Sequence, residues 1–287
     1  MNQNVVFFGS GWYTIPVVKK LIPLGLDLVV TTEKNPDSLF LKFCNENNLK
    51  TIQVSNASEI INQKSLIINH NVAILASFGE IIPQSLIDTL PHGVINIHPS
   101  LLPKFKGPSP IQYTLLSGDP ITGVSIIKLD DKVDHGPILA QQPYSLTGNE
   151  TAEDLLSILF EIGADLTEDI VTKIQKGEKI AETPQDHTLE SWSYKIKKND
   201  GYIDISTLSS SELELRNFKL ELARKVRAYY PWPGVWFIAR IKDKELRIKL
   251  LPENKIQPEG KNPMSYKDFL NGYEEEGRNL LIKLGLV

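Results

Sequence analysis

Short apolar runs alternate with helical patterns through the N-terminal part of the chain, and this alternation limits the possible folds more than any other feature. The runs cover residues 4–8, 27–32, 50–54, 72–77 and 94–98. The run 72–77 (VAILAS) is nearly all apolar, which is typical of a central parallel strand covered on both faces. The helical stretches between the runs provide the crossovers that parallel strands need. The sequence therefore predicts an α/β fold with a mostly parallel sheet.

One of these predicted strands carries polar side chains that could form a site. Residues 94–98 read VINIH, so Asn96 and His98 lie two positions apart and point to the same face. Pro99 follows directly and ends the strand, because it has no N–H to donate to a neighbouring strand. Open α/β sheets bind their ligands at the carboxyl ends of strands. We therefore expect Asn96 and His98 to belong to a functional site.

The second half of the chain is predicted to form a separate domain. A helix is expected over 152–175, since Thr151 and Asp154 have the spacing of a capping box and an apolar stripe follows. Residues 177–193 lose all periodicity and are expected to form a linker. The predicted domains are residues 1–180 and 194–287, joined by a linker over 181–193. Further elements are expected in the second domain: strands over 203–205, 235–241 and 245–250, and a helix over 212–228.

Composition excludes several classes of protein. Cys44 is the single cysteine among 287 residues, which excludes a disulfide framework. No run of 18 apolar residues exists and the first residues lack the features of a signal peptide, so we expect a cytoplasmic protein without membrane contact. The net charge of −4 argues against a uniformly basic chain. Residues 194–250 nevertheless contain 13 basic and 7 acidic residues, a local charge of +6 that favours a polyanionic partner. A solvated helix face whose basic and acidic residues pair would explain the same charges.

Two cofactor patterns are incomplete. Gly9-x-Gly11 follows a strand as in dinucleotide-binding proteins, but the third glycine is missing, and Ile15 and Pro16 occupy that region. A tight strand-to-helix turn also uses glycine. The acidic cluster of Asp130, Asp131 and Asp134 could bind a metal ion, but the sequence shows no further acidic ligands nearby. We therefore expect no metal and no bound nucleotide cofactor.

Several motifs together resemble the family of formyltransferases that take their formyl group from 10-formyltetrahydrofolate. They are Asn96-x-His98, the SLLP motif at 100–103, the loop 104–107, and Asp134. The C-terminal part is similar to the branch of this family that acts on methionyl-tRNA, on motifs within 197–204, 226–228, 231–234 and 257–270. The resemblance implies a Rossmann-like formyltransferase domain followed by a smaller, barrel-like domain of the OB type.

The chemistry of formyl transfer fits the three polar side chains. When an amine attacks the formyl carbon, negative charge develops on the formyl oxygen, and fixed hydrogen-bond donors stabilise it. The amide of Asn96 and a protonated His98 can both donate. Asp134 can stabilise the imidazolium by its opposite charge and can receive the proton of the amine, directly or through water.

The resemblance also implies binding residues. The residues expected around the folate are Phe78, Gly79, Ile81, Pro83, Ser100, Leu101, Leu102, Pro103 and Asp130. The residues expected to meet tRNA are Lys104, Lys106, Lys197, Lys198, Arg224 and Arg227. Folate would be consumed as a cosubstrate, the partner would be the initiator methionyl-tRNA, and the enzyme is expected to be a monomer.

The chain departs from the family pattern in three places. Residues 32–38 contain a single lysine where the tRNA enzymes carry a long basic loop, the barrel looks shortened after Leu251, and residues 213–224 lengthen the segment before the PWPG corner at 231–234. Two alternatives therefore stay open. One is a formyltransferase for a small amine, such as a nucleotide-linked amino sugar or glycinamide ribonucleotide. The other is an RNA-binding protein without catalytic activity.

Overall fold

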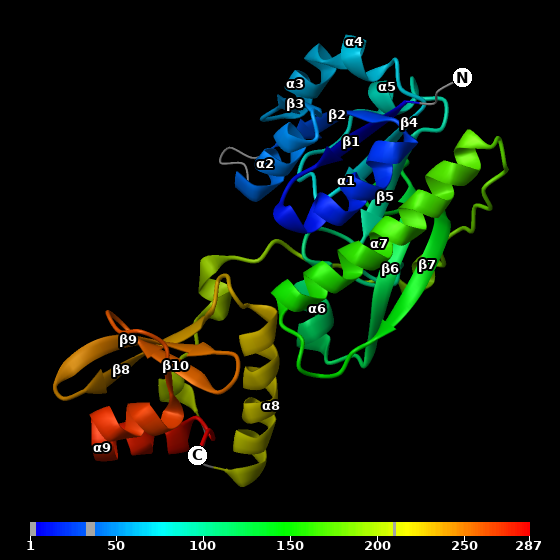
Figure 1. Cartoon of the computed structure of the whole chain (residues 1–287). Helices are drawn as coiled ribbons and strands as arrows, with labels where there is room; N and C mark the ends of the chain where they lie inside the picture. Colours follow the sequence, from blue (N-terminus) through cyan, green and yellow to red (C-terminus); the bar gives the residue numbers. More distant parts are fainter. Residues whose placement is uncertain (1–3, 33–37, 209–210) are drawn as a thin grey trace. The chain divides into compact units, whose positions relative to one another are not determined.

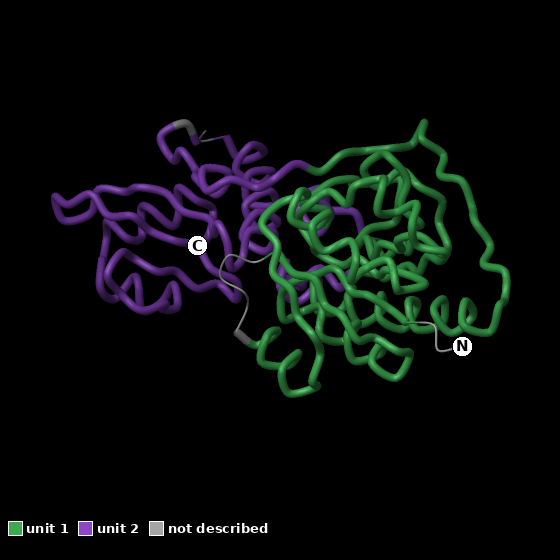
Figure 2. Tube along the Cα trace, turned by 90° about the horizontal axis from the view of Figure 1, so that it is seen from above, with its two compact units in different colours: residues 1–110, 121–145, 156–193 green, residues 111–120, 146–155, 194–287 purple. Residues whose placement is uncertain are grey.

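The computed structural model describes residues 4–32, 38–208 and 211–287, which form two compact units (Figure 2). Unit 1 comprises residues 1–110, 121–145 and 156–193, and unit 2 comprises residues 111–120, 146–155 and 194–287. The predicted linker, 181–193, groups with unit 1. The division into domains of residues 1–180 and 194–287 stays a prediction. The sequence predicts that residues 32–38, after the second strand, form no long basic loop. Most of these residues lie outside the described part of the chain.

The described part of unit 1 is built on a seven-stranded sheet of order β3-β2-β1-β4-β5-β6-β7 (Figure 1). Its strands are β1 (Val5–Gly9), β2 (Leu26–Thr31), β3 (Lys50–Gln53), β4 (Val72–Ala76), β5 (Val94–His98), β6 (Ile121–Lys128) and β7 (Ile138–Ser145). The strands β1 to β5 pair in parallel, whereas β6 and β7 are antiparallel to their neighbours. The predicted α/β fold with a mostly parallel, Rossmann-like sheet is confirmed.

Helices cover both faces of this sheet. In unit 1 they are α1 (Ile15–Leu21), α2 (Ser38–Glu46), α3 (Ala57–Asn62), α4 (Lys64–Ile67), α5 (Gln84–Ile87) and most of α7 (Ala152–Gln175). Helix α6 (Pro110–Ser117) belongs almost entirely to unit 2. The buried residues Val6 and Phe8 of β1 share one core with α3, α4 and α5. Phe7 points the other way, toward Phe40 of α2, with ring centroids 6.3 Å apart. The helices α1 and α7 lie side by side (Figure 1), and Lys20 Nζ is 2.7 Å from Glu168 Oε2.

The sequence predicted most of these elements but missed β7. This strand contains Gln141, Gln142 and Pro143, and its exposure pattern lacks a buried face. Proline and polar residues are compatible with a strand at the edge of a sheet, where one side needs no partner. The capping box was predicted correctly: Asp154 N–H donates to Thr151 Oγ1 at 3.2 Å, and Thr151 N–H donates to Asp154 Oδ2 at 3.0 Å.

Unit 2 contains a separate antiparallel sheet of order β11-β10-β9-β8 in its described part. Its elements are α8 (Glu212–Ala228), β8 (Val235–Ile241), β9 (Lys244–Leu251), β10 (Lys255–Pro258), β11 (Met264–Ser265) and α9 (Tyr266–Lys283). Alternate residues of β8 are buried, as expected for a sheet with one solvated face. This small sheet is consistent with the predicted barrel-like second domain.

The second domain differs from the prediction in one expected strand, and its elements β10, β11 and α9 were not predicted. The strand expected over 203–205 is absent from the described residues, which form the 3-10 helix Ile205–Thr207 there and a single bridge between Tyr202 and Trp236. Asp204 caps that turn by accepting from Ser206 N–H at 2.9 Å, so local side-chain chemistry outweighs the β-branched composition. Within the described residues, no helix combines the length and the apolar character needed to cross a bilayer.

Candidate active site

The carboxyl end of β5 brings Asn96 and His98 to one side of the sheet. Both side chains are buried, with 6% and 4% of their residue surface exposed. The strand lies between parallel β4 and antiparallel β6, so its backbone is held from both sides. Immediately after it the chain turns, and Ser100 N–H donates to His98 O at 2.9 Å. A strand fixed in this way gives both side chains little freedom to move.

Asp134 lies in the loop between β6 and β7 and contacts both residues of β5. Its Oδ1 accepts from Asn96 Nδ2 at 3.2 Å, and its Oδ2 lies 3.5 Å from His98 Nδ1. A third contact comes from Gly107 N–H, which donates to Oδ2 at 2.8 Å. The backbone of Asp134 is left-handed, with φ of 47°. The three predicted side chains therefore converge on one point, although their roles in catalysis stay predictions.

The hydrogen bonds of His98 fix which ring nitrogen carries a proton. His98 Nε2 is 3.0 Å from Phe105 O. A carbonyl oxygen can only accept, so Nε2 must be the donor in the neutral imidazole. Nδ1 then faces Asp134 and becomes a donor when the ring is protonated. The ring can therefore present a positive charge and an N–H group beside the carboxylate.

The loop 104–107 holds both of these contacts through its backbone. Phe105 O binds His98, and Gly107 N–H binds Asp134. Gly107 has φ of 99°, and a Cβ atom at this position would lie 2.5 Å from Ser193 O. Glycine is needed here for both reasons, since other residues rarely adopt this backbone and the space is filled. The loop approaches closely enough for its amide to reach the carboxylate because residue 107 has no side chain.

The residues predicted to surround folate lie in different environments. Ile81 is 75% exposed, whereas Phe78 is 2% exposed and packs edge-on against Phe8 at 5.2 Å. The side chain of Phe78 thus packs in the core, and its part in folate binding stays a prediction. Ser100 is fully buried, and its Oγ donates to Lys104 O at 2.6 Å. Leu102 is buried and donates its N–H to Ser125 Oγ at 2.9 Å.

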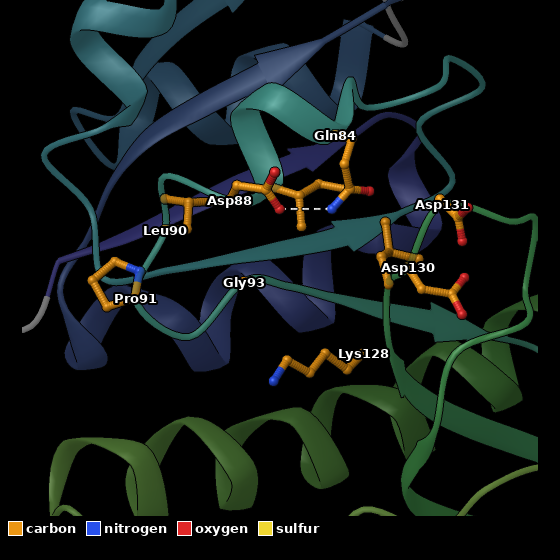
Figure 3. Close-up of a pocket in the computed structure, with 10 residues that line it drawn as sticks. Gln84, Asp88, Leu90, Pro91, Gly93, Lys128, Asp130 and Asp131 are labelled. Carbon is orange, nitrogen blue, oxygen red and sulfur yellow. Dashed lines mark hydrogen bonds between the residues drawn. The ribbon is translucent and has the colours of Figure 1, made fainter.

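A cavity of about 530 Å³ opens in unit 1 between α5 and the end of β6 (Figure 3). It is lined by Gln84, Ile87, Asp88, Leu90, Pro91, Gly93, Lys128, Leu129, Asp130 and Asp131. Gln84 Nε2 donates to Asp88 Oδ1 at 2.7 Å along its wall. The volume is within the usual range of small-molecule sites, about 300–1,000 Å³. Of the predicted site residues in the described part of the chain, Asp130 alone lines this cavity.

Asp130 is paired with a histidine next to Asp134. Its Oδ2 lies 2.6 Å from His135 Nδ1, and its Oδ1 accepts from Lys132 N–H at 3.0 Å. Burial alone would raise the pKa of Asp130, but these two hydrogen bonds lower it below its usual value. The ring of His135 stacks on that of His187, with centroids 4.1 Å apart. Asp130 is therefore held as a carboxylate at neutral pH.

The basic residues predicted to meet tRNA fall into two groups. Lys104, Lys197 and Lys198 are exposed, and Arg224 and Arg227 are half-buried in unit 2. Arg224 Nη1 donates to Ser117 O and Arg227 Nη1 to Glu150 O, each at 3.3 Å. Burial lowers the pKa of Arg227.

Lys106 differs from these basic residues. Its side chain is 1% exposed and its Nζ lies 2.7 Å from Glu190 Oε2. A buried and paired ammonium has little access to a phosphate in solvent, and the contact between Lys106 and tRNA stays a prediction.

The predicted linker contains site residues that sequence reasoning missed. Gln185 is 7% exposed, and its Nε2 donates to Asp134 O at 2.9 Å and to Gly136 O at 2.8 Å. Ser193 is buried and its Oγ accepts from Ser109 N–H at 3.0 Å. Nothing in the local sequence signals these contacts, because a polar stretch without periodicity looks the same whether it is solvated or buried. Among the described residues, no group of three or more His, Cys, Asp and Glu could hold a metal ion.

Comparisons with known proteins agree with the resemblance seen in the motifs. A sequence model of the formyl transferase family matches residues 30–166. The methionyl-tRNA formyltransferase of Koribacter versatilis is 31% identical over 98% of this chain and 99% of its own length. That of Thermodesulfovibrio yellowstonii is 30% identical over 95% of this chain and 96% of its own length. A crystal structure of a 4-N formyltransferase from Francisella tularensis superposes with a TM-score of 0.68 at 18% identity, over 88% of this chain and 98% of that one.

Proposed function

Because this chain belongs to the formyl transferase family, we propose that it transfers a formyl group from 10-formyltetrahydrofolate to the free amino group of methionyl-tRNA. The relatives that support this substrate are named methionyl-tRNA formyltransferases and match nearly their full length. The observation that carries the proposal is the convergence of Asn96, His98 and Asp134 at the end of β5.

The reaction creates negative charge on the formyl oxygen and releases a proton from the attacking amine. 10-Formyltetrahydrofolate supplies the formyl carbon: the amine nitrogen bonds to this carbon, the bond from the carbon to N10 of the folate breaks, and N10 takes up a proton as tetrahydrofolate leaves. Asn96 Nδ2 has two hydrogens and uses one of them for Asp134, so the other can donate to the formyl oxygen. Protonated His98 can donate through Nδ1, because Phe105 O occupies Nε2. Two donors fixed before the reaction stabilise the charge without reorganisation, and one such donor contributes about a hundredfold or more in rate.

Asp134 acts as the proton acceptor and as the counter-charge of His98 in this proposal. Its carboxylate is fixed by Asn96 and by Gly107 N–H, yet each carboxylate oxygen can accept more than one hydrogen bond. The amine proton can therefore pass to it directly or through a water molecule.

The folate would bind near the two loops that flank this cluster. Ile81 offers a large exposed apolar surface in the loop 78–83, which leads directly into α5 and the wall of the cavity. Asp130, held as a carboxylate, offers an acceptor for a pterin amino group on the other wall. Gly79 and Pro83 in the first loop, together with residues 101–103 after β5, complete the proposed folate contacts. These residues fit a flat heterocycle with polar edges.

The proposed partner is the initiator methionyl-tRNA, bound by an enzyme that acts as a monomer in the cytoplasm. Residues 194–250 carry a charge of +6, which supports a polyanionic partner. The proposed phosphate contacts are Lys104, Lys197, Lys198, Arg224 and Arg227. Lys197 and Lys198 begin the short 3-10 turn Lys198–Gly201 and are exposed, so both ammonium groups can reach a phosphate in solvent.

A formyltransferase for a small amine is the second candidate. The single lysine within residues 32–38 favours it, because the tRNA enzymes carry a basic loop there. The +6 charge of residues 194–250 favours methionyl-tRNA instead.

One experiment separates the two candidates. Purified protein and 10-formyltetrahydrofolate are incubated with methionyl-tRNA, with a nucleotide-linked amino sugar, or with glycinamide ribonucleotide, and formylated product is measured. We expect product with methionyl-tRNA, and filter binding of that tRNA that weakens steeply with added salt. Product with a small amine alone would favour the second candidate. No product with any amine would contradict formyl transfer altogether.

A further inference from the structure

The segment 183–193 contacts both loops that form the candidate active site. At one end, Thr183 pairs with Ile138 of β7 through N–H···O bonds of 2.8 and 2.9 Å in both directions. At the other end, Lys106 N–H donates to Ser191 O at 2.9 Å, and Ser193 N–H donates to Lys106 O at 2.6 Å. The 183–193 segment therefore runs from the strand after Asp134 to the loop after His98. It joins the two places from which the reacting groups are held.

Gln185 fastens this segment to the turn that carries Asp134. Its side-chain nitrogen donates to Asp134 O and to Gly136 O, at 2.9 and 2.8 Å. Both partners are carbonyls, so the nitrogen of the amide must face them and its orientation is fixed. Asp134 has a left-handed backbone, and a Cβ atom on Gly136 would lie 1.8 Å from Lys128 O. The turn is thus tight and unusual in its backbone, and a buried side chain holds two of its carbonyl groups.

Lys106 fastens the 183–193 segment to the other loop. Its Nζ lies 2.7 Å from Glu190 Oε2, 3.1 Å from His187 Nδ1 and 5.7 Å from the centroid of the Trp192 ring. All three partners belong to the 183–193 segment. A buried ammonium is costly unless it is paired, so these contacts hold the lysine in one place. Burial and then the charge of Lys106 lower the pKa of His187, which agrees with a neutral ring that accepts from the ammonium.

Lys106 lies between the two residues of the loop 104–107 whose backbone groups bind His98 and Asp134. The residue before it supplies Phe105 O, which selects the tautomer of His98. The residue after it supplies Gly107 N–H, which binds Asp134. A shift of the loop by even a fraction of an ångström would move both contacts together, and misplacement by about 1 Å can cost a hundredfold in rate.

We propose that Lys106 and Gln185 are positioning residues of the formyl transfer reaction, which fix His98 and Asp134 through the backbone of the two loops and do not touch the substrates. Lys106 acts through Phe105 and Gly107, and Gln185 acts through the carbonyl of Asp134. The inference rests on the proposed function for its kinetic test, but its structural part can be measured without any substrate.

The kinetic test compares Lys106→Met with Lys106→Arg, which keeps the charge, and with Gln185→Leu, which removes both donated hydrogen bonds at similar volume. Lys179→Met is the matched control, because Lys179 is an exposed lysine just before the segment. We expect Lys106→Met and Gln185→Leu to lower kcat about tenfold or more while KM for both substrates changes less than about twofold. Lys106→Arg should recover most of kcat, and Lys179→Met should match the wild type.

The substrate-free test follows amide hydrogen exchange of residues 104–107 and 134–136. Faster exchange of these amides is expected in Lys106→Met and Gln185→Leu, with the global unfolding transition still cooperative. A rise in KM for tRNA with unchanged kcat would show that Lys106 binds substrate and would overturn the proposal. Unchanged exchange would overturn it as well, even if the wild type formylates methionyl-tRNA. If the wild type formylates no amine, the exchange experiment still decides whether Lys106 and Gln185 position the loops.

Discussion

The end of strand β5 and the 183–193 segment both lie against Asp134, yet they contribute to the candidate site in opposite ways. Strand β5 contributes side chains: Asn96 and His98 point at the carboxylate. The 183–193 segment contributes restraint, since Gln185 binds the carbonyl of Asp134 and its other contacts hold the loop 104–107. The comparison teaches that two of the three proposed reacting groups lie on a regular strand, whereas the exact placement of the cluster depends on an irregular segment from elsewhere in the chain. Substitutions in the two regions should therefore differ in size and in kind.

The largest effect is expected from His98→Ala on the strand side. This change removes a proposed donor to the formyl oxygen and the partner of Phe105 O, so kcat should fall about a hundredfold to a thousandfold. Steady-state formylation of methionyl-tRNA measures this change. If His98→Ala cost no more than Gln185→Leu, the distinction between reacting and positioning residues would fail.

The second largest effect on kcat is expected from Gly107→Ala. Gly107 binds Asp134 through its N–H and lies against Ser193 of the 183–193 segment. The new Cβ would lie 2.5 Å from Ser193 O in a backbone of φ 99°, so either the loop or the 183–193 segment must move. We expect kcat to fall about tenfold or more and the free energy of unfolding to fall by roughly 1–3 kcal/mol. Denaturant unfolding and the transfer assay measure the two effects. Gly148→Ala is the control for left-handed strain alone, because no atom lies within 4 Å of its Cβ position.

A moderate effect that belongs to neither region is expected from Ile81→Ala. Ile81 is 75% exposed, so its loss should hardly change stability. If folate covers this side chain, KM for 10-formyltetrahydrofolate should rise about fivefold with little change in kcat, in line with about 1 kcal/mol of lost apolar contact. A fall in kcat at constant KM would instead place Ile81 with the positioning residues.

The smallest effect is expected on protein stability, when the pH is lowered and His187 and Glu190 of the 183–193 segment take up protons. The pKa of His187 is lower in the folded protein than in the unfolded chain, where a histidine has its usual pKa of about 6.5. Below that pH the unfolded chain therefore binds the proton more readily than the folded protein does. Stability contributed by neutral His187 is therefore present above that pH and decreases as the pH falls. The pKa of Glu190 is also lowered, chiefly by its hydrogen bond with Lys106, so its contribution is lost at still lower pH. The melting temperature of the wild type should fall from pH 7 to 5.5 more than that of His187→Gln, and equal slopes would contradict this role.

Sequence reasoning predicted the strand side well for a physical reason. The alternation in 94–98 and the apolar stripe of 152–175 each follow from the local period of one element, and the structure has both elements at the predicted limits, Val94–His98 and Ala152–Gln175. The helix over 212–228 was likewise predicted correctly as α8, whose first turn is capped by Ser211. Local patterns determine elements of this kind.

The 183–193 segment could not be predicted in the same way. The residues of this segment lack periodicity. Gln185 of the segment is buried against Asp134, and Lys106 is buried against Glu190 of the segment, so each depends on a partner far away in sequence. The convergence of Asp134 with strand β5 was expected from a resemblance to known proteins, not from its spacing. Contacts between irregular segments depend on the tertiary fold, and the local sequence carries no sign of them.

The most direct test of the account is single-turnover formylation of methionyl-tRNA by the wild type and by Asp134→Asn. The substitution keeps the shape of the side chain and an oxygen for Gly107 N–H, but it removes the negative charge and the proton acceptor. The account predicts formyl-methionyl-tRNA from the wild type and a rate at least about a hundredfold lower from Asp134→Asn at equal substrate affinity. Equal rates for the two proteins would contradict it.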